Sequence, residues 1–232
     1  MIKSMQSDIA SFFSVLSSNN LKLTSFIGQN IFVGGIDTTF GTIEWALAEL
    51  IANPNKMEPL QSELTRVIGN RNCVDISDLL NLPYLSVVVK ETMRMHLVVP
   101  RLVPQKLTHS CELLGYEILV GTQAYVNVWA IGHDPNIWEN PFLFSPERFL
   151  DSRLTSVQGV NWNFLPFGSG RRICPRLALA SLNLEFILAS LLHSLEWKVC
   201  GEPKLNESFG IIVHMETPLV VKAYPRLPLQ MT

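Results

Sequence analysis

The segment that decides the fold reads Phe-Gly-Ser-Gly-Arg-Arg-Ile-Cys-Pro at positions 167–175. Its glycines permit a tight loop, and Pro175 suits the first position of a helix, where a missing backbone N–H is not needed. The positive end of that helix and the two arginines would stabilise a thiolate at Cys174. No histidine base is paired with this cysteine in the sequence, so the pattern resembles a metal ligand more than a nucleophile. A buried, inert cysteine beside a helix start is the simpler alternative.

A second irregular stretch, Gly-Gly-Ile-Asp-Thr-Thr at 34–39, interrupts a segment whose apolar periodicity predicts one helix over 23–53. Each interior glycine costs about 1 kcal/mol relative to alanine. A threonine there can donate to the carbonyl four residues earlier, at Gly34, and bend the helix. The glycines would let a flat or small group approach the backbone, with Asp37 and Thr38 as a polar pair beside it. Close packing of two helices explains the glycines equally well at this stage.

A charged pair marks the third irregular place. Glu91 and Arg94 are three residues apart on the helix predicted over 83–96, so they share a face. Most such pairs are solvated and contribute a few tenths of a kcal/mol. The apolar neighbours at 87–89 favour a buried helix instead, where a charged pair needs further partners. Arg148 is the candidate for such a partner.

The remaining pattern predicts a mainly α fold with small β sheets, of the α+β class. A helix is expected over 54–68, with Gly69 as its stop, and Pro59 should kink it or delay its start. Another helix is expected over 175–195. Residues 132–172 are rich in proline, glycine and aromatics, which indicates a packed, functional loop. Strand-like segments are found at 112–119, 123–128, 209–215 and 218–223.

Composition excludes several classes of protein. The 232 residues carry a net charge of −2, so the chain lacks the basic face that nucleic-acid binding requires. Hydrophobic residues make up 47%, which argues against disorder. Four cysteines without a CxxC pattern indicate neither a disulfide scaffold nor a zinc site. Charged residues reach only 16% against about 25% in typical domains, so we expect some apolar surface to meet something other than water.

The sequence offers no uninterrupted apolar run of about 18 residues, the usual sign of a membrane span. Residues 9–16 follow Lys3 and are apolar, but Asp8 precedes them and no small-residue cleavage site follows. They are predicted to form an amphipathic helix rather than a signal peptide. We therefore expect neither a targeting segment nor a membrane anchor in this chain.

Together these motifs resemble those of the cytochrome P-450 haem-thiolate monooxygenases. The motifs keep that family's order and spacing: Gly-Gly-x-Asp-Thr at 34–38, Glu-x-x-Arg at 91–94, Pro-Glu-Arg-Phe at 146–149 and Phe-x-x-Gly-x-Arg-x-Cys at 167–174. The sequences at 126–132 and 137–141 are similar to the plant microsomal type, especially the branch that contains geraniol and other terpenoid hydroxylases. The resemblance extends from about residue 8 to the C-terminus and corresponds to the C-terminal half of such an enzyme.

The resemblance implies a partial cytochrome P-450 domain over 1–232, with the N-terminal half and the membrane anchor absent. It implies haem b (iron protoporphyrin IX) as the cofactor and Cys174 as the metal ligand. The implied cofactor-binding residues are Phe167, Gly170, Arg172, Cys174, Gly34 and Gly35. The implied catalytic residues are Asp37 and Thr38, and the implied structural ion network is Glu91, Arg94 and Arg148.

The implied reaction inserts one oxygen atom from dioxygen into a C–H bond of a small lipophilic, terpenoid-like substrate. Electrons would come from NADPH-cytochrome P-450 reductase, and full-length members would lie on the cytosolic face of the endoplasmic reticulum membrane. Substrate contacts are implied at 97–102, 31–35 and 209–212. The chain departs from the family where Arg176 replaces the usual glycine and where Leu97-Val98 replaces Pro-Pro. An inactive truncated fragment, or a partial gene model with weak or no haem binding, is the alternative.

Overall fold

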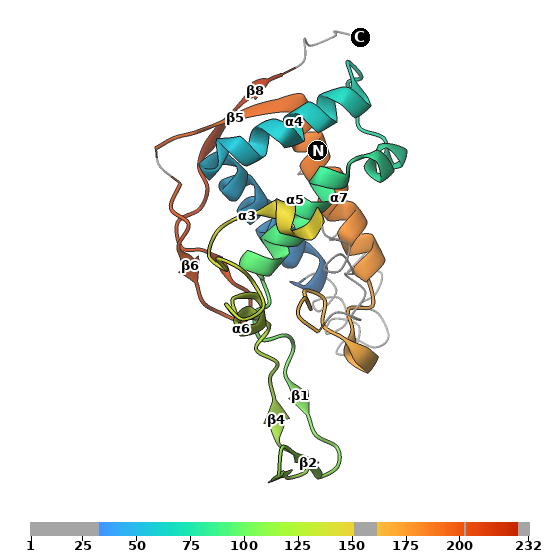
Figure 1. Cartoon of the computed structure of the whole chain (residues 1–232), viewed down its shortest axis with the longest axis vertical. Helices are drawn as coiled ribbons and strands as arrows, with labels where there is room; N and C mark the ends of the chain where they lie inside the picture. Colours follow the sequence, from blue (N-terminus) through green and yellow to red (C-terminus); the bar gives the residue numbers. More distant parts are fainter. Residues whose placement is uncertain (1–32, 151–161, 202, 227–232) are drawn as a thin grey trace, which may run out of the picture. The chain divides into compact units, whose positions relative to one another are not determined.

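The computed structural model describes residues 33–150, 162–201 and 203–226 (Figure 1). The chain divides into two units, 1–38 and 39–232. The helix predicted over 9–16 and the first part of the long helix, 23–32, lie outside the described residues. The described part is mainly helical and adds four two-stranded antiparallel sheets, which confirms the predicted class.

The glycine-rich stretch of the first unit forms a π-helical turn, η1 (Val33–Asp37), that leads into α3 (Thr38–Ala52). Thr38 Oγ1 donates a hydrogen bond to the Gly34 carbonyl at 2.8 Å, which confirms the predicted bond to the preceding turn. Wide turns of this kind occur mostly as single turns within helices and often at functional sites. At its other end the helix stops at Ala52, because the next two residues are Asn53 and a proline.

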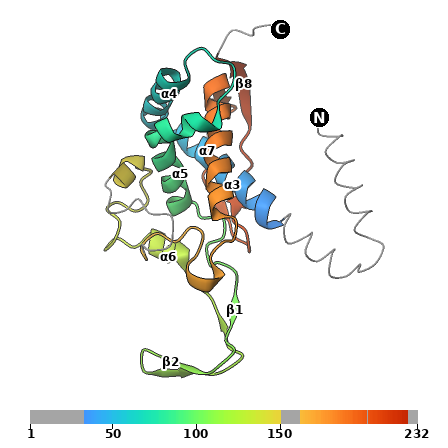
Figure 2. The same ribbon diagram turned by 90° about the vertical axis from the view of Figure 1, so that its right-hand side faces the viewer.

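Three helices enclose the core of the second unit, and all three pack against one another (Figure 2). They are α4 (Pro54–Ile68), α5 (Pro83–Met95) and α7 (Leu177–Ser194), and the 3-10 helix η2 (Ile76–Asn81) joins α4 to α5. Their apolar faces meet in fully buried leucines: Leu60, Leu64, Leu85, Leu188 and Leu192. The apolar periodicity therefore predicted these helices correctly, since it records the face that each helix buries.

The ends of two of these helices differ in detail from expectation. α4 begins at Pro54, so of the two predicted effects of Pro59, a kink or a delayed start, the delayed start is excluded; Pro54 takes the first-turn place that suits proline. Gly69 ends the helix as predicted, with a φ of 66° and its N–H bonded to the Thr65 carbonyl. α7 begins at Leu177 rather than at Pro175, because the loop before it makes one further turn.

The loop predicted over 132–172 is packed against the core through some of its described residues; residues 151–161 lie outside the described part. It contains the end of α6 (Val128–Gly132) and the 3-10 helices η3 (Pro146–Leu150) and η5 (Gly170–Arg172). Four of its aromatic side chains are 3% exposed or less: Trp138, Phe144, Phe149 and Phe164. They join the main core cluster, whereas Phe142 and Trp162 are 67% and 70% exposed, so the aromatic content predicted the packing only in part.

The strands form local hairpins and one longer-range pair. The pairs are β1 (Gln105–Lys106) with β4 (Gln123–Ala124), β2 (Cys111–Leu113) with β3 (Tyr116–Ile118), β5 (Leu195–Val199) with β8 (Val221–Pro225) and β6 (Glu207–Ser208) with β7 (His214–Met215). The hairpin that carries β1 to β4 extends away from the helices of its unit (Figure 1).

Three strand predictions are wrong. The segment 123–128 is a strand only over its first two residues, and the helix α6 begins at Val128. The segment 112–119 is not one strand but a hairpin, because Leu114 and Gly115 adopt φ angles of 53° and 82° that turn the chain. The segment 209–215 is a strand only over its last two residues. In addition, β5 was not expected, because it follows α7 without a turn signal. Alternation of apolar and polar residues predicts a strand only where one face of the strand is buried, and this exposed hairpin has no buried face.

Among the described helices, α7 alone has the length and mean hydropathy, 1.5, of a candidate membrane span. Its buried residues include Leu184, Leu188 and Leu192, which belong to the main core cluster. Core helices of this kind pass the same test, so the feature is weak evidence for a membrane.

Candidate functional site

The cysteine loop is closed by its own backbone. The Cys174 N–H donates to the Phe167 carbonyl at 3.0 Å, and the Ile173 N–H donates to the Gly170 carbonyl at 3.2 Å. Gly168 and Gly170 have φ angles of 73° and 67°, a conformation that side chains disfavour. The glycines predicted from the sequence are therefore needed to bring Phe167 and Cys174 together.

Cys174 is a free, partly exposed cysteine next to the start of α7. The first amide of the helix, Leu177 N–H, donates to the Cys174 carbonyl at 3.3 Å. Phe167 packs against the main core cluster and so anchors one side of the loop. Arg172 is exposed, and a Cβ added at Gly170 would meet no described atom within 4 Å. The loop thus presents a thiol, a cation and open space together.

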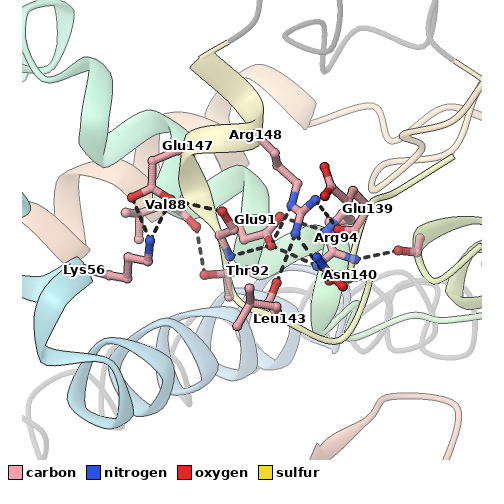
Figure 3. A network of polar contacts seen from close by, with 12 residues as sticks. Lys56, Val88, Glu91, Thr92, Arg94, Glu139, Asn140, Leu143, Glu147 and Arg148 are labelled. Carbon is pink, nitrogen blue, oxygen red and sulfur yellow. Dashed lines mark hydrogen bonds and ion pairs between the residues drawn. The ribbon is translucent and has the colours of Figure 1, made fainter. Parts of the chain in front are cut away.

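A buried ion network joins the helix α5 to η3, and Figure 3 shows its charged members. Arg94 donates to both oxygens of Glu91, at 2.8 and 2.9 Å, and both side chains are 0% exposed. Arg148 Nε reaches the Glu91 Oε1 atom at 3.0 Å, and the Ser145 N–H adds another bond at 2.9 Å. The structure thus brings Glu91, Arg94 and Arg148 together, and the pair is buried rather than solvated.

The two arginines connect Glu91 to the surrounding backbone. Arg94 Nη1 donates to the Gly132 carbonyl at 2.6 Å, and Arg148 donates to the carbonyls of Glu139 and Leu143 at 2.9 and 3.1 Å. A Cβ added at Gly132 would lie 2.7 Å from the Arg94 carbonyl oxygen, so only glycine fits there. The network therefore fixes the end of α6 and the aromatic loop against α5.

A second group of polar contacts is centred on the carboxylate of Glu147, next to Arg148. Its carboxylate accepts hydrogen bonds from Lys56 Nζ at 2.9 and 3.0 Å and from the Tyr84 hydroxyl at 2.9 Å. Burial raises the pKa of Tyr84, and the neighbouring Glu147 raises it further. Burial alone would raise the pKa of Glu147, but the bonds from Lys56 and Tyr84 lower it overall. This group joins η3 to α4 and α5.

Sequence reasoning missed a carboxylate that caps α5 from another helix. The Glu63 side chain, on α4, accepts the backbone N–H groups of Tyr84 and Leu85, both at 3.0 Å. These amides lie in the first turn of α5 and have no partner within the helix. No local pattern could reveal the contact, because 21 residues separate Glu63 from Tyr84.

The other residues predicted for the site, Gly34, Gly35, Asp37 and Thr38, share the π-helical turn and its junction with α3. They belong to the first unit, whereas the Cys174 loop belongs to the second. Arg176 is exposed at the N-cap of α7, two residues after Cys174.

Comparison with known proteins identifies the class. The family model for cytochrome P-450 matches residues 2–223, so the chain belongs to the cytochrome P-450 family. Cytochrome P-450 76C1 of Arabidopsis thaliana is 46% identical over 82% of this chain, and geraniol 8-hydroxylase of Catharanthus roseus is 45% identical over 82%. The chain covers 38% and 39% of these two relatives, so it spans about two fifths of their length.

Solved structures give the same class. A zebrafish cytochrome P-450 solved with abiraterone superposes with a TM-score of 0.76 at 33% identity. The match covers 86% of this chain and 46% of the zebrafish chain. The predicted family and its fold are therefore confirmed over most of the chain.

The residues of the second unit fit the thiolate side of a haem group, the cofactor that the family implies. The loop offers a partly exposed thiol for iron and an exposed guanidinium for a carboxylate of the porphyrin edge. Within the described residues, no group of three or more His, Cys, Asp or Glu side chains could hold a metal ion. A metal held by a macrocycle needs only an axial ligand from the protein, and Cys174 can supply it.

Proposed function

We propose that this chain is part of a haem-dependent monooxygenase that hydroxylates a small lipophilic, terpenoid-like substrate. The observation that carries the proposal is the cysteine loop, closed by its own backbone and presenting Cys174 beside a helix start. The relatives named geraniol 8-hydroxylase, from Catharanthus roseus and Swertia mussotii, support the terpenoid class of substrate at 45% identity each. The match to only part of each relative supports assigning 1–232 to a partial cytochrome P-450 domain.

The proposed cofactor is haem b, which when bound supplies the activation of dioxygen and the transfer of one oxygen atom to the substrate. Cys174 is the proposed axial thiolate, which donates electron density to the iron. Arg172 is proposed to pair with a propionate, and Phe167 to shield the sulfur from water. Gly170, with a φ of 67°, allows the loop to turn tightly before Cys174, where the cofactor would be held.

The motif at 34–38 extends the proposal to the first unit. Gly34 and Gly35 are assigned to leaving space beside the cofactor, and Asp37 and Thr38 to proton delivery. The Thr38 hydroxyl donates a hydrogen bond to the Gly34 carbonyl at 2.8 Å, which fixes the side chain against the π-helical turn. NADPH-cytochrome P-450 reductase and dioxygen are the proposed partners, at the cytosolic face of the endoplasmic reticulum membrane.

The test is a carbon monoxide difference spectrum of the reduced chain after haem is supplied. The proposal expects a thiolate-type Soret band, which Cys174→Ser removes because serine is not a thiolate ligand. Cys200→Ser is the matched control, since Cys200 is also a free cysteine and lies outside the loop. No thiolate-type band in the unaltered chain would contradict the proposal and favour an inactive fragment with weak or no haem binding.

A further inference from the structure

A buried histidine at the end of α5 lies between two carboxylates from distant parts of the chain. His96 Nε2 is 2.7 Å from Glu49 Oε1, on α3, and His96 Nδ1 is 3.1 Å from Glu207 Oε1, on β6. The His96 side chain is 6% exposed, the Glu49 side chain 2% and the Glu207 side chain 15%. All three residues belong to the second unit.

The geometry requires a proton on each ring nitrogen. The second oxygen of Glu49 accepts a hydrogen bond from Asn53 Nδ2 at 3.0 Å, so that oxygen carries no proton directed at the amide. A carboxylate accepts and does not donate, whereas a neutral imidazole has only one N–H. Two carboxylates facing both ring nitrogens are therefore satisfied together only by the imidazolium form.

The surroundings of the ring favour that charge. The Trp45 indole stacks on the imidazole with ring centroids 3.9 Å apart and planes 3° from parallel, and an aromatic face stabilises an adjacent cation. Burial alone would lower the pKa of His96, but the bonds to Glu207 and Glu49 and their charges raise it overall. His133, from the end of α6, also faces this group; burial lowers its pKa, which favours the neutral ring.

The three residues join separate elements. Around them, Trp45, Val98 and Met215 form a small apolar cluster, and the Val213 N–H donates to the Val98 carbonyl at 2.8 Å. Between β6 and β7, Phe209 and Ile211 are 66% and 87% accessible, whereas Val213 is 1% accessible. The contact of Glu207 therefore holds one end of this segment, and Val213 and Met215 hold the other.

We propose that His96 is an imidazolium bridge that holds the β6–β7 segment, residues 207–215, against α3 and the end of α5, and that the bridge opens when the ring loses a proton. The neutral ring keeps one N–H. Glu49 retains it, because its contact is shorter and Asn53 supports its other oxygen. Glu207 is released, since it is the more exposed carboxylate and can turn to water.

The sign of the pH dependence follows from the raised pKa. The ordinary pKa of histidine is 6.5, and the bridge is fully formed below that pH. The bridge is lost as the pH rises through the pKa of His96 in the folded chain, which is higher. Between these two pKa values, the protection of the segment against hydrogen exchange should fall as the pH rises, by at most about tenfold per pH unit after correction for the intrinsic exchange rate, because the open ring stays bonded to Glu49. Neither measurement below uses haem, so its outcome is independent of the proposed activity.

The first test follows the ring nitrogens of His96 by nuclear magnetic resonance in the full chain, from about pH 6 to about pH 9. The proposal expects both nitrogens to carry protons at the lower end and one to lose its proton at a pH above that of an ordinary histidine. A ring that is neutral throughout, with the proton on Glu49 or Glu207 instead, overturns the proposal. This measurement needs no variant and so does not depend on the folding of one.

The second test measures hydrogen exchange of residues 207–215 in Glu207→Gln. A glutamine amide can accept a bond from a ring N–H or donate one to a bare ring nitrogen, so the pH dependence of protection should vanish. Glu216→Gln is the matched control, because Glu216 contacts Asn206 Nδ2 at 3.2 Å rather than His96. It should keep the wild-type slope. An unchanged slope in Glu207→Gln refutes the bridge.

Discussion

Replacing Glu91 with glutamine removes the charge at the centre of the buried ion network. The Glu91 carboxylate accepts four hydrogen bonds between 2.8 and 3.0 Å, three of them from Arg94 and Arg148. Glutamine has nearly the same shape, so it leaves no cavity. Its amide group, however, turns a donor toward one of the arginine donors and leaves two guanidinium charges without an anion.

The magnitude follows from burial. Removing one partner of a buried ion pair costs about 3–5 kcal/mol, because the remaining charge stays buried and uncompensated. An exposed pair contributes about 0.2–1 kcal/mol. The Glu91 and Arg94 side chains are 0% exposed and Arg148 is 12% exposed, so the larger value applies. A domain of this size is stable by about 5–15 kcal/mol in total, so the variant should lose a large part of its stability.

The assay is equilibrium unfolding in urea, followed by circular dichroism, for the unaltered chain and Glu91→Gln. The matched control is Glu196→Gln, which breaks a pair with Lys198 at 3.6 Å whose side chains are 53% and 62% exposed. The control should change the free energy of unfolding by less than about 1 kcal/mol. A Glu91→Gln variant that unfolds at a midpoint indistinguishable from that of the control would refute the assignment of a buried, structurally essential network.

Three other changes test separate contacts. Glu63→Gln should lower the free energy of unfolding by about 1–2 kcal/mol, because the first turn of α5 loses a charged cap. Glu58→Gln is the control, since Glu58 is an exposed residue of α4, the helix that also carries Glu63. Equal unfolding midpoints for the two variants count against the cap. Gly132→Ala should destabilise the chain in the same assay, since the new Cβ would lie 2.7 Å from the Arg94 carbonyl oxygen; wild-type stability contradicts this close approach. Arg176→Gly should increase haem retention during gel filtration if the arginine crowds the cofactor, and unchanged retention shows that Arg176 is harmless.

Local signals in the sequence were sufficient to predict the helices and the cysteine loop. The apolar periodicity predicted both α4 and α5 correctly, because each helix buries one continuous face. The glycines at 168 and 170 predicted a tight turn before Cys174, since their φ angles are ones that other residues disfavour. The strands were predicted poorly: the hairpin around Gly115 is exposed, so no buried face constrained its pattern.

The sequence by itself determined the class of this protein and the loop that presents Cys174, because both depend on residues that are close together in the chain. The tertiary structure decided which charges meet. Arg148 reaches Glu91 across 57 positions, Glu63 caps a helix 21 residues away and Glu207 meets His96 across 111. Burial and pairing of charges are properties of the packed chain, since the same Glu-x-x-Arg spacing fits an exposed pair equally well until the surrounding core excludes water.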